Sequence, residues 1–228
     1  MQISSALILV FCLFLPALAQ KDAYEDDIRA LTAAGKVEHN IYSNPHAGFA
    51  IHLPLAQCQS ELNTRTDFSR GSAMLLACVR DKGDGGYSFH ILAETWAHYP
   101  GLTLEQYVRS MRHLAERDPN MKTIQTETPR KWAGLDFLET IATIQQPGHL
   151  PYVGMTCTHL NAYVMCFRGE ADTEALARAL VMLDRKLEIG TTPAQEPRPR
   201  ARSEKRRGLI ACSIEAYPAL PALNIISP

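Results

Sequence analysis

The sequence predicts an α+β fold: a central antiparallel sheet flanked by helices in an α/β/α sandwich. Short segments with apolar residues at every second position, typical of strands, occur in two groups along the chain. After each group comes a stretch with apolar residues three and four positions apart, which is typical of an amphipathic helix. Runs of strands separated by segregated helices favour an antiparallel sheet over a doubly wound parallel one.

The first group of strands follows a short helix predicted over residues 24–34, which Gly35 ends. Four strands are expected here: 36–44, 48–54, 72–80 and 87–96. The last two are predicted to form a hairpin, because the glycines of the DKGDGG segment between them supply the positive φ angles that a tight turn needs.

A helix separates the first group of strands from the second. Thr103 and Gln106 form a capping-box pattern at its start, and Asp118-Pro119 ends it. Four strands in meander order are then expected: 121–129, 134–145, 152–159 and 162–169. Their turns are predicted at 130–134, at 146–151 and at Leu160-Asn161. A last helix is expected over 173–188, with Leu176, Leu180, Leu183 and Leu187 on its buried face.

The first residues predict export. Residues 3–19 are an uninterrupted apolar run that ends in Ala17-Leu18-Ala19, the small-x-small pattern of a signal peptidase site. We therefore expect a signal peptide over residues 1–19, cleaved near Ala19-Gln20, and an extracytoplasmic protein, periplasmic or secreted. The alternative is an uncleaved N-terminal anchor, because no Lys or Arg precedes the apolar run.

Charge and composition divide the rest of the chain near residue 190. Residues 20–190, the expected single domain, carry a net charge of −4, which does not favour nucleic acid as a partner. Residues 191–228 carry +3 and are rich in Pro and Arg, which predicts a disordered linker and tail. The basic run over 198–207 could contact anionic lipid, but a solvated tail is favoured.

Four cysteines fall within the expected domain, and in an exported chain an even number favours disulfides. The order of the strands favours a disulfide between Cys58 and Cys78, because an antiparallel return would bring the two residues close together. Cys157 and Cys166 flank the predicted turn at Leu160-Asn161, which would make them diagonal neighbours, farther apart than a disulfide prefers. Disulfides and buried free thiols both remain open for this second pair.

A metal site is the alternative on the same hairpin. Cys157, His159 and Cys166 would offer three ligands that zinc accepts. The spacing is not that of known structural zinc sites, however, and His159 lies at the turn. The metal reading is therefore the less favoured one.

No other pattern indicates a metal or a catalytic centre. His90, Glu94 and His98 share a face if they lie on a strand, but they would then span roughly 26 Å at about 3.3 Å per residue. A polar face of a half-covered sheet explains them better. The DKGDGG segment lacks the ligand positions of a calcium loop, and no hydrolase, phosphate-loop or zinc-protease motif is present.

Three segments of the chain resemble the PsbP/Mog1-like superfamily, which includes the bacterial extracytoplasmic DcrB-like proteins. These are IYSNPHAGFAIHLP, TPRKWAGLDFLETIAT and AYVMCFRGEADTEALARALVMLDRKLEI, and the resemblance spans residues 37–190. It implies a central antiparallel sheet flanked by helices, in a protein that is usually a non-enzymatic extracytoplasmic or adaptor component. It implies no catalytic residues.

We therefore expect an exported, non-catalytic accessory or binding protein with a protein partner and no cofactor. The alternative is a metal-binding protein or metal-dependent enzyme that uses Cys157, His159 and Cys166.

Overall fold

A computed structural model describes residues 24–53, 59–67, 70–80, 86–184 and 186–190. The predicted signal peptide (residues 1–19), the predicted tail (191–228) and Cys58 lie outside the described residues. Within the described ranges, no helix is both long and apolar enough to cross a membrane.

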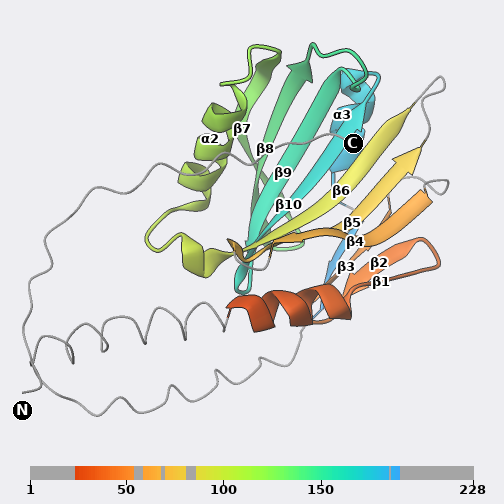
Figure 1. Cartoon of the computed structure of the whole chain (residues 1–228), viewed down its shortest axis with the longest axis vertical. Coiled ribbons are helices and arrows are strands. Elements are labelled where there is room, and N and C mark those ends of the chain that lie inside the picture. Colours follow the sequence, from red (N-terminus) through yellow and green to blue (C-terminus); the bar gives the residue numbers. More distant parts are fainter. Residues whose placement is uncertain (1–23, 54–58, 68–69, 81–85, 185, 191–228) are drawn as a thin grey trace, which may run out of the picture. The chain divides into compact units, whose positions relative to one another are not determined.

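The described strands form two antiparallel sheets (Figure 1). The smaller sheet has the order β1 (Lys36–Glu38), β2 (Ile41–Asn44), β3 (Phe49–His52), β11 (Leu187–Ile189). The larger has the order β4 (Gln59–Asp67), β5 (Ser72–Arg80), β6 (Tyr87–Thr95), β10 (Tyr163–Ala171), β9 (Tyr152–Leu160), β8 (Leu135–Ile144), β7 (Met121–Trp132). The helical segments are residues 24–34, η2 (Trp96–His98), α2 (Leu104–Ala115) and α3 (Glu174–Val181).

The main core lies between the two sheets. Phe49 of β3 meets Phe167 of β10 edge to face, with ring centroids 6.1 Å apart. The helix over residues 24–34 closes one side of this core with Ile28 and Leu31, both fully buried. Asn44, also buried, donates a hydrogen bond to the Leu31 carbonyl, so the end of that helix is tied to β2.

The predicted α/β/α sandwich is wrong, because the fold is β-rich and its strands are divided between two antiparallel sheets. Residues 36–52, which we expected to join the central sheet, form the separate four-stranded sheet with β11. The last helix is also shorter than the predicted 173–188. It ends at Val181, since Met182 has an extended backbone with ψ 107°, and Leu187 is buried in β11 instead.

Most of the predicted elements are confirmed, including the helix at 24–34, the hairpin of β5 and β6 and the meander from β7 to β10. The capping box is present as predicted: Thr103 Oγ1 accepts from the Gln106 amide, and Gln106 Oε1 accepts from the Thr103 amide. Strand β4 was not predicted, because its sequence, QSELNTRTD, has no apolar alternation.

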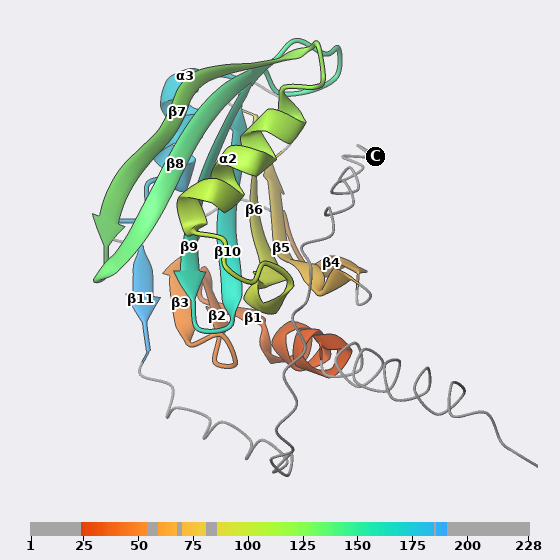
Figure 2. The same ribbon diagram turned by 90° about the vertical axis from the view of Figure 1, so that its left-hand side faces the viewer.

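The two faces of the large sheet are covered differently. α3 packs against β9 and β10 on the side of the small sheet. There Gly169 allows a close approach, since an added Cβ would lie 2.6 Å from Leu180 Cβ. α2 lies on the opposite side, called here the α2 face, and contacts β7, β8 and β9 (Figure 2).

Candidate functional site

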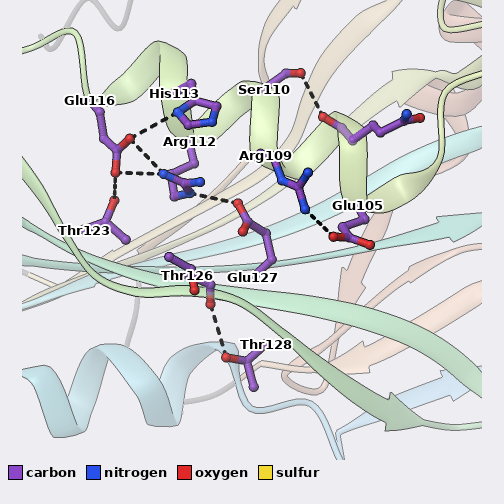
Figure 3. A network of polar contacts seen from close by, with 11 residues as sticks. Glu105, Arg109, Ser110, Arg112, His113, Glu116, Thr123, Thr126, Glu127 and Thr128 are labelled. Carbon is purple, nitrogen blue, oxygen red and sulfur yellow. Dashed lines mark hydrogen bonds and ion pairs between the residues drawn. The ribbon is translucent and has the colours of Figure 1, made fainter.

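A network of ion pairs holds α2 toward the β7 edge of the sheet (Figure 3). Arg112 Nε donates to Glu127 Oε1 of β7 at 2.8 Å, and its Nη1 donates to Glu116. Thr123 donates to Glu116 Oε1 at 2.6 Å, and this bond lowers the pKa of that carboxyl, with Arg112 acting in the same direction. The hydrogen bond to Glu127 raises the pKa of Arg112, so the pair stays charged.

Beneath α2, a disulfide joins Cys157 of β9 to Cys166 of β10. The predicted register is wrong: the turn is Asn161-Ala162, so the two cysteines lie directly opposite each other, with Cα atoms 4.1 Å apart. Asn161 takes the positive φ of 54° that this turn needs, a conformation that asparagine tolerates. The hairpin is therefore fixed covalently, and Tyr107 and Val108 of α2 cover the bond.

This disulfide bears directly on the predicted metal site of Cys157, His159 and Cys166. The sulfurs of Cys157 and Cys166 are bonded to each other and cannot act as thiolate ligands. His159 is exposed and stacks against Trp96, with ring centroids 4.9 Å apart. Within the described ranges, no group of three or more His, Cys, Asp or Glu side chains could hold a metal ion. Cys78 is also disulfide-bonded, while its expected partner, Cys58, lies outside the described residues.

A carboxylate on β6 is enclosed by tyrosines from the α2 region. Tyr99 and Tyr107 donate hydrogen bonds to Glu94 Oε2 at 2.6 and 3.0 Å. Burial raises the pKa of both phenols, and the Glu94 charge raises them further, so both stay protonated as donors. His98 lies apart from this group and packs against Tyr24. The cluster helps to seat α2 on β6.

A second closed cluster joins three segments that are distant in sequence, and sequence reasoning missed it. Tyr163 donates to Asp27 Oδ2 at 2.6 Å, and His46 Nε2 lies 3.1 Å from Asp27 Oδ1 and 2.9 Å from the Tyr163 oxygen. Burial, followed by the bond to Asp27, raises the pKa of Tyr163, which makes its phenol a poor nucleophile. The cluster ties the first helix to β10.

A third group, on the α2 face, is not closed. We call it the β6–β10 polar cluster: Ser88 and His90 of β6 with Arg168 and Glu170 of β10. His90 lies directly opposite Arg168, and Ser88 opposite Glu170. Arg168 Nη2 lies 2.6 Å from Glu170 Oε1, and both side chains are largely buried. Both ring nitrogens of His90 and the Ser88 hydroxyl are screened from solvent, and the described residues provide none of them with a hydrogen-bond partner.

The surroundings of His90 keep its ring neutral. Burial lowers its pKa below the ordinary value of 6.5, Arg168 and Arg65 lower it further, and Glu170 opposes them. A neutral imidazole has one N–H donor and one acceptor nitrogen. On β5, the neighbours of the cluster are Ala77, opposite His90, and Val79, opposite Ser88.

The chemistry of this cluster fits binding better than catalysis. Ser88 and His90 are not hydrogen-bonded to each other, so the arrangement lacks the bonded nucleophile and base that covalent catalysis requires. A buried polar atom without a partner costs about 1–3 kcal/mol. Ligand contact would recover that cost.

Sequence reasoning found only part of this site. It singled out His90, but as one member of a set with Glu94 and His98 that the structure separates. Ser88, Arg168 and Glu170 were missed. The available signal was the spacing of Ser88 with His90 and of Arg168 with Glu170, two polar pairs at alternate positions of otherwise apolar strands.

Comparison of the chain with protein-family models and with curated protein sequences finds no match to either. The resemblance to the PsbP/Mog1-like superfamily therefore stays a prediction.

Proposed function

We propose that this is an exported, non-catalytic binding protein, and that it presents the β4–β6 part of the α2 face to a protein partner. The observation that carries the proposal is the β6–β10 polar cluster. Within the described part of the chain, the Ser88 hydroxyl and both ring nitrogens of His90 have no hydrogen-bond partner, although they lie on a strand in the interior of the sheet. Binding surfaces held on strands are positioned more accurately than those on loops.

The position of α2 supports this choice of face. Its contacts are with β7, β8 and β9, and it reaches β6 near Glu94 through Tyr107. Strands β6, β5 and β4 continue the sheet beyond β10, on the side away from the strands that α2 contacts most. Val79, the next-to-last residue of β5, lies opposite Ser88 and is 46% exposed.

Export is supported by the disulfide chemistry as well as by the N-terminal pattern. The bond between Cys157 and Cys166, together with the bonded Cys78, is typical of proteins that fold in an oxidising compartment. The resemblance to extracytoplasmic accessory proteins implies the same location. N-terminal sequencing of the mature chain tests the cleavage: a start at Gln20 supports export with a cleaved signal peptide, and a start at Met1 contradicts cleavage and favours the uncleaved anchor.

The proposal is tested with a photo-crosslinking amino acid placed at one position at a time in the full chain, in the source cells. Val79 probes the proposed face. Ile124 on β7 and Met182 after α3 serve as controls, because their exposed fractions of 45% match that of Val79. We expect one defined protein to be crosslinked from Val79 and not from the controls, and to be displaced by excess unlabelled protein. Equal crosslinking from all three positions, or none from Val79, would contradict the proposal.

A further inference from the structure

We propose that the outer edge of β4 joins two copies of this chain, by pairing antiparallel with the same strand of a second copy. The inference does not depend on the partner protein proposed above. It follows from the position of β4 in the large sheet, and from the order and exposure of the charged side chains along it.

β4 is the end strand of the large sheet. It pairs with β5 on one side, and no described strand pairs with its other side. Such an edge presents backbone N–H and C=O groups with which another chain can pair. The opposite edge, β7, is less suited to this, because Pro129 has no N–H and the pairing of β7 with β8 is irregular at two points. β4 has nine residues and contains neither proline nor glycine.

Two opposite charges of β4 lie on the same face of the sheet. Glu61 and Arg65 are both on the α2 face, because their β5 partners lie opposite His90 and Leu92, which share one face of β6. Both charged side chains are exposed. No described residue forms an ion pair with Glu61, whereas Arg65 also interacts within its own chain. A guanidinium has five N–H groups, so donors remain for a second carboxylate.

The register that pairs the most residues is also the one that the charges favour. When β4 pairs with its own copy over all nine residues, Gln59 lies opposite Asp67 and Glu61 lies opposite Arg65. The twofold symmetry of such a dimer makes the Glu61–Arg65 pair twice. Directly opposite residues share a face and have Cβ atoms about 4.5–5.5 Å apart, so the charges meet. A shift by two residues, the smallest that keeps the faces matched, places Glu61 opposite Asp67 or opposite an uncharged residue.

Charged side chains on an edge strand usually oppose pairing with another chain. In β4 the full-length register turns them into complementary pairs, and it also places Ser60 opposite Thr66, whose hydroxyls can bond across strands. The twofold axis of an antiparallel pair is perpendicular to the sheet. The α2 faces of both copies therefore lie on the same side, and the dimer presents two β4–β6 surfaces beside each other.

Sedimentation velocity of the full, exported chain, from about 1 µM to about 1 mM, measures the association. We expect the wild type to change from monomer to dimer over this range. Glu61→Arg should raise the dissociation constant at least about tenfold, because each dimer would then contain two Arg–Arg pairs. Arg65→Glu should have a similar effect, since it creates two Glu–Glu pairs.

The decisive sample is an equimolar mixture of Glu61→Arg and Arg65→Glu. A mixed dimer restores both opposite-charge pairs, which neither variant can form alone, and its formation also shows that both variants are folded. Asp136→Arg and Lys131→Glu serve as the control pair, because they change the net charge by the same amounts at exposed positions of β8 and β7. Each control should dimerise as the wild type does.

Several outcomes would overturn the proposal. These are a wild type that stays monomeric, a dimer that neither β4 variant weakens, a mixture that dimerises no better than each variant alone, or control variants that behave like the β4 variants. If Val79 crosslinks a defined partner while the chain stays monomeric, the proposed function stands and the dimer does not. If the chain dimerises as expected while Val79 crosslinks no other protein, the dimer stands and the partner role does not.

Discussion

Replacing His90 with leucine is expected to make the protein more stable, although the residue is largely enclosed. Both ring nitrogens are screened from solvent without a partner. Each such group costs about 1–3 kcal/mol, and an apolar side chain of similar size removes the cost while keeping most of the packing. The two nitrogens together give about 2–6 kcal/mol, and we take the lower limit, about 2 kcal/mol, as the gain in the free energy of unfolding.

Urea unfolding followed by far-UV circular dichroism measures this gain. With a slope of about 2 kcal/mol per molar, a gain of about 2 kcal/mol raises the midpoint of His90→Leu by about 1 M with the slope unchanged. Ile91→Ala is the control next in sequence, since Ile91 is fully buried on the opposite face; its midpoint should fall by about 1–2 M. A fall of 0.5 M or more for His90→Leu would show that the ring stabilises the fold, and the reasoning behind the polar cluster would fail.

The difference in stability between the wild type and His90→Leu should depend on pH, which gives a second prediction. Burial and then Arg168 lower the pKa of folded His90 below its ordinary 6.5. Below about pH 6.5 the unfolded chain binds a proton there that the folded chain does not, so the free energy of unfolding falls as the pH falls. The fall ends once the pH is below the folded-state pKa. The free energy of unfolding of His90→Leu should therefore exceed that of the wild type by more at pH 5 than at pH 7.5. An equal or smaller difference at pH 5 would contradict a lowered pKa of His90.

Three further variants test how the fold is held. Gly169→Ala should lose about 1–3 kcal/mol of unfolding free energy, because its Cβ would lie 2.6 Å from Leu180 Cβ and α3 must move; unchanged thermal stability would contradict this packing. Ala133→Asn should gain about 1 kcal/mol in urea unfolding, since Ala133 has a φ of 49° in the β7–β8 turn, which asparagine adopts more easily. Replacing Cys157 and Cys166 together with alanine should cost about 3 kcal/mol for a link with a sequence separation of 9; a loss under about 1 kcal/mol would mean that α2 alone holds the hairpin.

Local patterns were enough to predict most of the elements, but not how the strands are divided between sheets. Apolar alternation identifies a strand whichever sheet it joins, so residues 36–52 gave no sign that they form a sheet of their own. The leucines at the end of the chain were ambiguous for a related reason. Leu183 and Leu187 are four apart, which suits a helix, yet Leu187 is buried in a strand. Strand β4 lies at the sheet edge, where side chains on both faces can stay polar.

The candidate site was harder to predict because it depends on register. Moving the turn from Leu160-Asn161 to Asn161-Ala162 changes the partner of Cys157 from Val164 to Cys166, and with it the chemistry of the hairpin. The polar cluster depends on the pairing of β6 with β10, two strands whose paired residues are far apart in the sequence, as His90 and Arg168 are. The spacing of residues along one strand cannot supply that information.

The residues that hold the sheet and those that form the polar cluster lie on the same strands, yet their substitutions should act differently. Cys166 is bonded to β9 and covered by α2, whereas Arg168 is two positions further along the same face and contacts Glu170. Arg112 holds α2 at the β7 side, and the helix covers the disulfide of the hairpin. A change at Cys166 should therefore lower stability. A change at His90 should instead weaken the proposed partner contact while the fold is kept, and this separation is what a dedicated binding surface requires.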